Sequence, residues 1–261
     1  MKPLAELDPR DVKTVLVDVD DTLTTGGKLT AEAYAALERL HAAGRVVVPV
    51  TGRPAGWCDH IARMWPVDAV VGENGAFYFF FSDGKLNKRF LEDATARARK
   101  RFRLDAIAQR ILSEVPGCAL AADQSYRETD LAIDYCEDVP PMPLEAAERI
   151  AALMREAGLE AKISSIHVNG WFGDYDKLAT SRLLFAERFG LDLHRSSGEF
   201  VFVGDSQNDA PMFGFFENSV GVANVRRFDG RLATSPKYVT RGSSGAGFVE
   251  LVGHLLREEA S

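Results

Sequence analysis

The chain has 261 residues, of which 46% are hydrophobic and 26% are charged. This composition is close to the average for globular proteins and argues against a disordered, collagen-like or coiled-coil chain. Its length exceeds that of most single-core domains, so we expect two domains. The net charge of −7 works against broad attraction to nucleic acid or to an anionic membrane surface, so neither is expected as a partner.

The sequence has no stretch with the length of a membrane span or the apolar core of a signal peptide. Its three cysteines are odd in number and lack metal-ligand spacing, which is typical of reduced thiols. We therefore expect a cytoplasmic protein. The oligomeric state stays open.

Three short apolar runs in the first part of the chain predict strands that are buried on both faces. They cover residues 12–17, 46–50 and 69–71. Residues 30–43 have the apolar spacing of a helix, with Thr30 as its N-cap and Gly44 beyond its end. A second helix is expected to begin at Pro54. Pro49 lacks a backbone donor, so the second strand should end or bulge there.

The middle of the chain has a different character. Residues 77–81 are aromatic and precede an Asp-Gly pair, which predicts a hairpin. Two helices and two short strands follow, at 93–114, 144–157, 131–135 and 161–166. This mixture predicts a small α+β domain over residues 90–167, inserted into a larger domain made of residues 1–89 and 168–261.

The last part returns to the first pattern. It predicts helices over 175–190 and 247–256 and strands over 200–203 and 219–223. The whole alternation predicts an α/β protein, with a Rossmann-like doubly wound parallel sheet as core and the inserted α+β cap domain. Because ligands bind beyond the carboxyl ends of such strands, Asp18, Thr51 and Asp205 should converge there.

The clearest chemical signal is a set of carboxylates at these strand ends. Asp18 and Asp20 follow the first strand, and Asp205 and Asp209 follow the strand over 200–203. Asp18 and Asp20 alone would fit a solvated acidic turn equally well. Four carboxylates at one edge repel each other unless a hard cation such as Mg²⁺ lies between them, so the two motifs together favour an ion site.

Two weaker signals accompany the carboxylates. Thr51 and Gly52 end a strand just before a helix, where a hydroxyl and free backbone N–H groups suit a phosphate oxygen, although simple helix capping is common there. Lys177 begins the helix after the insert and could bring a positive charge over the same edge, whereas most lysines are solvated.

In this order, the motifs resemble those of the haloacid dehalogenase superfamily of phosphohydrolases. The four motifs are Asp18-x-Asp20-x-Thr22, Thr51, Lys177 and the segment from Gly204 to Asp209. The segments 51–54 and 72–76, with an insert between the second and third motifs, resemble the Cof-type branch, subfamily IIB, which carries a C2 cap. The resemblance spans the core, whereas the cap matches by position and size only.

The resemblance implies a role for each residue. Asp18 is the nucleophile that forms an aspartyl-phosphate, and Asp20 is the general acid and base. The phosphoryl group of the substrate is bound by Thr51, Gly52, Lys177 and Asn208. The Mg²⁺ ligands are Asp18, the backbone carbonyl of Asp20 and Asp205, with support from Asp209 and Asn208. Asp21 stands where the family often has Gly, and no catalytic role is assigned to it.

We therefore expect a Mg²⁺-dependent phosphatase acting on a small phosphorylated metabolite, with a sugar phosphate as the family-level expectation. A sugar phosphomutase of the same superfamily and a non-catalytic phosphoacceptor switch are the alternatives. The basic segment 97–103 would suit nucleic acid, but a solvated face of the cap is the preferred interpretation.

Overall fold

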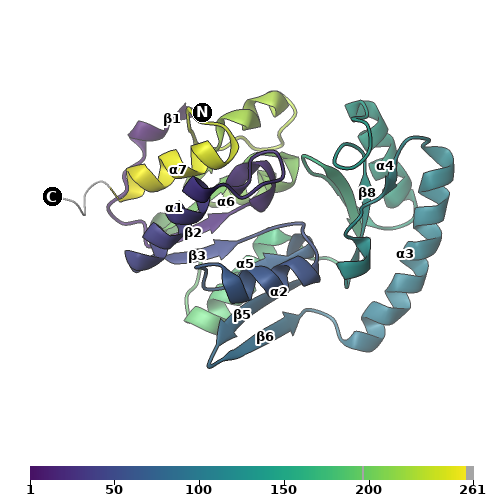
Figure 1. Ribbon diagram of the computed structural model, residues 1–261, viewed down its shortest axis with the longest axis horizontal. Helices are drawn as coiled ribbons and strands as arrows, with labels where there is room; N and C mark the ends of the chain where they lie inside the picture. Colours follow the sequence, from purple (N-terminus) through teal and green to yellow (C-terminus); the bar gives the residue numbers. More distant parts are fainter. Residues whose placement is uncertain (196, 257–261) are drawn as a thin grey trace.

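The computed structural model describes residues 1–195 and 197–256. Its ribbon has two parts (Figure 1). One contains a six-stranded parallel sheet with helices on both faces, and the other a four-stranded antiparallel sheet with two helices. We call them the core and the cap. Within the described ranges, none of the helices combines the length and hydrophobicity of a membrane span.

The parallel sheet contains the strands predicted from residues 12–17, 46–50, 200–203 and 219–223, whereas the run 69–71 belongs to a smaller antiparallel sheet. In spatial order they are β1 (Lys2–Pro3), β13 (Tyr238–Val239), β12 (Asn218–Gly221), β11 (Phe200–Gly204), β2 (Thr14–Val17) and β3 (Val46–Pro49). β3 ends at Pro49, as predicted from its missing donor. The chain leaves β2 toward β3 on one side and reaches β11 on the other, so a topological switch point lies at the end of β2.

Alternate side chains of these strands are buried on opposite faces. Val15 and Val17 pack with α1 (Ala31–Ala42) and α7 (Ser244–Leu255), whereas Leu16 lies in the opposite cluster. That cluster includes residues of α5 (Lys177–Leu184) and α6 (Ala210–Phe215). Burial on both faces explains why these strands are continuous apolar runs.

A smaller antiparallel sheet extends the core. It consists of β4 (Val70–Gly72), β5 (Phe77–Ser82) and β6 (Lys85–Phe90), and α2 (Ala55–Met64) packs beside it. The predicted hairpin is confirmed, because β5 and β6 pair directly. Asp83 and Gly84 between them have φ values of 52° and 71°, the left-handed conformation that such a two-residue turn requires.

The cap is built from the predicted α+β elements and two strands that were not predicted, β7 (Ala119–Leu120) and β10 (His167–Trp171). Its sheet has the order β7, β8 (Asp130–Asp134), β10 and β9 (Glu160–Ile163), and its helices are α3 (Ala94–Glu114) and α4 (Leu144–Glu156). The predicted boundary between residues 167 and 168 falls inside β10, which pairs with β8 and β9 along its length. A boundary after Trp171 therefore agrees better with the sheet, and the two-domain division stays a prediction.

The basic segment of α3 is not the solvated face that we expected. Arg97 stacks on the Phe90 ring at 3.9 Å, Lys100 donates to the Phe172 carbonyl at 2.8 Å, and Arg101 donates to the Asp130 carbonyl at 3.1 Å. These three side chains are partly buried, whereas Arg99 and Arg103 are exposed. Long basic side chains can pack along apolar surfaces while their charged ends bind carbonyls, and here they fix α3 to the segments that enter and leave the cap.

Candidate active site

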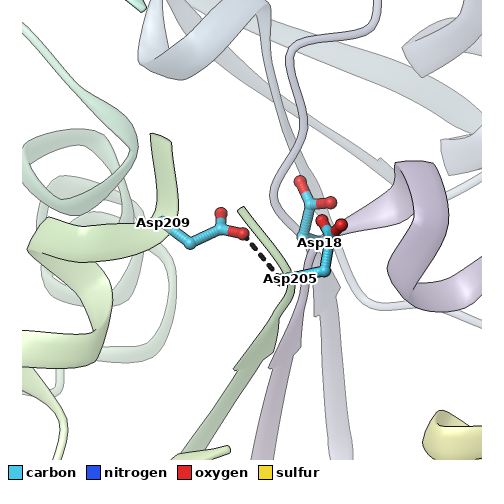
Figure 2. Close-up of side chains that lie close together, drawn as sticks. All are labelled: Asp18, Asp205 and Asp209. Atoms are coloured by element: carbon cyan, nitrogen blue, oxygen red, sulfur yellow. Dashed lines mark hydrogen bonds between the residues drawn. The ribbon is translucent and has the colours of Figure 1, made fainter. Parts of the chain in front are cut away.

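Three carboxylates meet at the carboxyl ends of β2 and β11. Figure 2 shows Asp18 and Asp205 at the ends of adjacent strands, with Asp209 reaching toward them from the following turn. One oxygen of each lies within 4.8 Å of the others, and all three residues are buried. Three of the four predicted carboxylates therefore converge, whereas the Asp20 side chain pairs with Arg53.

The cluster carries more negative than positive charge. Burial raises the pKa of Asp18 well above its ordinary value although Lys177 opposes the shift. Burial and the neighbouring Asp209 raise the pKa of Asp205 to about 7. The buried Lys177 Nζ lies 2.6 Å from Asp18 Oδ1 and 2.7 Å from Asp209 Oδ1. The half-exposed Arg227 lies 2.9 Å from Asp205, so two cations face three carboxylates. The negative charge that remains is one that a hard divalent ion with oxygen ligands would balance, so the donor set fits Mg²⁺.

Asp205 is oriented by three donors from two other segments. Thr22 donates to its carboxylate at 3.4 Å, Asn224 at 3.0 Å and Arg227 at 2.9 Å. The contact with Thr22 connects the first and the last motif of the sequence. Arg227 and Asn224 carried no sequence signal, because they follow a strand end late in the chain without a recognisable motif.

The predicted phosphate-binding residues have free donors near the cluster. Thr51 Oγ1 accepts the backbone N–H of Arg53 at 3.0 Å, which leaves the Thr51 hydroxyl hydrogen available. Asn208 Oδ1 accepts the Ser206 hydroxyl at 2.6 Å, which leaves the Asn208 amide group available. Gly52 packs against the Asn74 side chain, only 3.2 Å from where a Cβ atom would stand. A side chain at position 52 would therefore crowd this loop.

A small cavity separates the core from the cap. Its core side is lined by Asp18, Asp20, Gly52, Arg53, Ser206 and Asn208, and its cap side by Ser164, Ser165, Ile166, His167 and Asn169. Its volume of about 10 Å³ is on the scale that admits a single water molecule. The cap is thus closed over the predicted nucleophile. Thr51, Lys177, Asp205 and Asp209 lie outside the cavity lining, with Lys177 joined to it through Asp18.

Asp20 faces an ion-pair network that sequence reasoning did not find. Arg53 Nη2 lies 2.8 Å from Asp20 Oδ1 and 2.6 Å from Oε1 of the cap residue Glu137. Glu137 Oε2 lies 2.8 Å from His167 Nε2. Arg53 belongs to the motif 51–54, which was its only signal, and Glu137 lies in a loop that only the folded cap brings to the site.

A second buried contact joins cap and core beside this network. Glu73 accepts the backbone N–H of Ala55 at 2.9 Å, that of Glu128 at 2.9 Å and that of Thr129 at 2.7 Å. In the opposite direction, Arg127 of the cap donates to the Gly52 carbonyl at 2.8 Å. The cap therefore rests directly on the loop that carries the predicted phosphate-binding residues.

Among the described residues, Asp21 is not one of the three that form the carboxylate cluster. Its φ of 56° places it in the left-handed region, where aspartate is tolerated and glycine is favoured. Its carboxylate lies 3.2 Å from Arg227. A glycine at this position would adopt the same conformation without steric cost.

Comparison with known proteins shows the family to which this chain belongs. Residues 15–103 match the family model of haloacid dehalogenase-like hydrolases. A phosphoglycolate phosphatase from Pyrobaculum neutrophilum is 30% identical over 248 residues, which cover 94% of this chain and 96% of the relative. The chain belongs to the haloacid dehalogenase-like hydrolases. The predicted resemblance is confirmed.

Further comparisons place this haloacid dehalogenase-like hydrolase among phosphatases. A phosphoglycolate phosphatase from Archaeoglobus fulgidus is 28% identical over 244 residues, covering 93% of this chain and 96% of the relative. With such relatives, the hydrolase is a phosphoric monoester hydrolase. A solved structure from Thermoplasma acidophilum has a TM-score of 0.68 at 19% identity and covers 94% of this chain and 98% of its own, which supports the predicted fold class.

Proposed function

We propose that the protein is a Mg²⁺-dependent phosphatase that hydrolyses a small phosphorylated metabolite through an aspartyl-phosphate on Asp18. The observation that carries this proposal is the buried cluster of Asp18, Asp205 and Asp209 around Lys177, directly beside the closed cavity. Phosphoryl transfer depends mainly on positioning and charge neutralisation, and this cluster provides both.

The metal ligands in this proposal are Asp18, Asp205 and the backbone carbonyl of Asp20, with Asp209 and Asn208 in support. When bound, Mg²⁺ supplies positive charge that neutralises the carboxylates and the phosphoryl oxygens. The chain contributes an all-oxygen donor set and excludes bulk water, since Asp18, Asp205 and Asp209 are buried.

The proposed chemistry proceeds in two displacements. One Asp18 oxygen is held by Lys177, and the other attacks phosphorus while the bond from phosphorus to the leaving oxygen breaks. Asp20 donates its proton to that oxygen. Asp20 then takes a proton from water, whose oxygen attacks phosphorus and releases inorganic phosphate and the Asp18 carboxylate. Thr51, Gly52, Lys177 and Asn208 bind the phosphoryl oxygens throughout.

The named relatives point to a small substrate. The earlier prediction of a sugar phosphate stays open. However, two relatives are named phosphoglycolate phosphatases. Their names favour phosphoglycolate or a similar small substrate. Hydrolysis is also favoured over the mutase alternative, because the named relatives are phosphatases.

The proposal is tested by phosphate release from phosphoglycolate, glucose 6-phosphate and other phosphorylated metabolites, with Mg²⁺ and with EDTA. We expect EDTA to abolish turnover and Asp18→Asn to remove it. Asp105→Asn is the matched control, because Asp105 is exposed on α3. Wild-type turnover in Asp18→Asn would disprove the nucleophile, and activity unaffected by EDTA would disprove the metal.

A further inference from the structure

Arg53 is a buried cation with an unusual set of partners. Its side chain is 4% exposed, and it pairs with one carboxylate of the core, Asp20, and with two of the cap, Asp123 at 3.3 Å and Glu137 at 2.6 Å. Of the described residues that line the cavity, it is the only lysine or arginine. The Trp57 ring stacks 4.4 Å from its guanidinium carbon. Stacking fixes the plane of the guanidinium and leaves its N–H groups directed along that plane.

The three partners differ in how firmly they are enclosed. The Asp20 and Asp123 side chains are 16% and 7% exposed, whereas Glu137 is 26% exposed and borders a second, more open cavity beside Asp20 and Asp21. Glu137 is therefore the partner that solvent reaches most easily. Removing Glu137 would free the N–H edge of the guanidinium that it binds.

Glu137 also contacts a second polar side chain that lines the cavity, His167. His167 Nε2 lies 2.8 Å from its carboxylate, yet this nitrogen has no hydrogen bond of good geometry. The His167 side chain is 3% exposed and lines the same cavity as Arg53. The Glu137 carboxylate, at the edge of the cavity, thus forms an ion pair with Arg53 and lies close to His167 Nε2 without a well-oriented hydrogen bond.

The short separation between the leaving oxygen and the carboxylate of a small substrate fits the positions of Asp20 and Arg53. In the proposed reaction Asp20 protonates the leaving oxygen, and Arg53 is bonded to Asp20 at 2.8 Å. In a phosphorylated 2-hydroxycarboxylate, a single carbon atom separates that oxygen from the carboxylate. A carboxylate in this position lies beside Arg53, whose planar fork matches carboxylate oxygens.

We propose that Arg53, together with His167, binds the carboxylate of a phosphorylated 2-hydroxycarboxylate such as phosphoglycolate, and that Glu137 takes the place of this carboxylate while the closed site holds no substrate. This inference rests on the proposed phosphatase function and adds the residue that selects the substrate. Once Glu137 is displaced, Arg53 keeps Asp20 and Asp123 as partners, and the N–H group that bound Glu137 needs a new acceptor. A substrate carboxylate replaces the lost charged partner in this buried site, whereas a neutral sugar hydroxyl does not.

The test compares phosphoglycolate with ethyl phosphate, in which a methyl group replaces the carboxylate. We expect the wild type to favour phosphoglycolate at least tenfold in kcat/KM with Mg²⁺. Arg53→Gln should lower the ratio of the two kcat/KM values about 10- to 100-fold, as expected for the loss of a hydrogen-bonded ion pair. Arg53→Lys should retain part of the ratio. Because only folded protein turns over, the ratio measured on one preparation is independent of the folded fraction.

A role of Arg53 in positioning Asp20 alone would lower kcat/KM for both substrates equally, and that result would overturn the inference. A wild type that hydrolyses other phosphate esters but shows no preference for phosphoglycolate would overturn it while leaving the phosphatase proposal intact. A wild type without Mg²⁺-dependent turnover of any ester would overturn the phosphatase proposal first.

The proposed role of Glu137 is tested separately. Glu137→Gln keeps the size of the side chain and removes the competing charge, so the KM for phosphoglycolate should fall about threefold while that for ethyl phosphate stays unchanged. Glu156→Gln is the matched control, because the ion pairs of Glu156 with Arg110 and Arg149 are exposed and Glu156 lies outside the cavity lining. Equal KM changes for both substrates would show that Glu137 does not stand in for the substrate.

Discussion

Gly204 and Asp209 are closely fitted to each other at the end of β11. A Cβ atom on residue 204 would lie 2.5 Å from Asp209 Oδ2, closer than side-chain atoms approach in folded proteins. That oxygen accepts the backbone N–H groups of Asp205 and Ser206. The other oxygen accepts a hydrogen bond from Lys177, so the Asp209 side chain has little freedom to move. The glycine therefore allows Asp209 to position the lysine.

Gly204→Ala should consequently lower kcat/KM by about 100-fold, because displacing a positioning group by about 1 Å has effects of this size. Gly253→Ala is the control: Gly253 lies in α7 with no neighbouring atom within 4 Å of an added Cβ. This control should keep wild-type kinetics and gain up to about 1 kcal/mol of helix stability. Wild-type kinetics in Gly204→Ala would show that a side chain at position 204 does not displace Asp209.

The sequence was informative for some site residues and silent for others. Asp18 and Asp205 could be placed because each directly follows an apolar run, and parallel strands bring such ends to one edge. Arg53 could not be assigned a role, since a single arginine after Thr-Gly is equally compatible with a solvated side chain. Glu137 reaches Arg53 across 84 residues of sequence, through the fold of the cap.

At the scale of elements, the same physics explains which strands were predicted. β2, β3 and β11 are almost entirely apolar because helices cover both faces of their sheet. β10 was missed because alternate residues, His167 and Asn169, face the polar cavity. A strand that contributes to a site loses the apolar pattern that would reveal it.

The contact between cap and core combines an enclosed part with a more accessible one. Burial raises the pKa of Glu73 to about 7, although the backbone N–H groups that it accepts favour the ionised form. We regard the ionised form as the working state, because Thr129 and Glu128 donate to it. The Arg53–Glu137 pair is more exposed. The accessible pair should therefore open first when the cap admits a ligand.

This difference leads to a prediction about pH. Burial raises the pKa of Glu137, but the close contact with His167 and the hydrogen-bonded ion pair with Arg53 outweigh it and bring the pKa from 4.5 to about 2. A pKa lowered by folding contributes stability that is complete above pH 4.5 and is lost as the pH falls toward 2. Glu137→Gln removes this contribution, which is on the order of 2 kcal/mol. The difference in melting temperature between wild type and variant should thus be largest near pH 5 and shrink toward pH 3.

The exposed control Glu156→Gln should show a small difference in melting temperature that changes little over the same range, because exposed ion pairs contribute little to stability. If Glu137→Gln differs from wild type by the same amount at pH 5 and pH 3, the ion pair does not hold the cap in the closed position.

For the whole molecule, length and alternation were enough to predict a parallel core interrupted by an α+β insert. They could not predict how far the cap closes, which depends on contacts between residues distant in sequence, such as Glu73 with Thr129 and Arg127 with Gly52. The closed cavity of about 10 Å³ cannot contain a phosphate ester together with its leaving group. Substrate entry therefore requires the cap to move, and the buried carboxylates are covered again when it closes.

These buried carboxylates should make the stability of the whole molecule depend on Mg²⁺. Mutual repulsion within the cluster destabilises the metal-free fold. Free Mg²⁺ at 100 times its Kd adds about 2.7 kcal/mol to the free energy of unfolding. For a chain of this size, that corresponds to a rise in melting temperature of roughly 5–10 °C. Asp18→Asn removes one of the repelling charges while Lys177 keeps Asp209 as a partner. It should therefore melt no lower than the wild type in EDTA, but gain little from Mg²⁺.

Asp105→Asn, which leaves the cluster intact, should gain as much from Mg²⁺ as the wild type does. Calorimetry in EDTA and in Mg²⁺ separates two explanations of the buried cluster. If Asp18→Asn melts far below wild type in EDTA, the Asp18–Lys177 pair stabilises the fold by itself, and the three carboxylates need no cation. If instead the wild type and Asp105→Asn gain stability from Mg²⁺ and Asp18→Asn does not, the negative charge concentrated at this sheet edge is tolerated in the fold because an ion neutralises it.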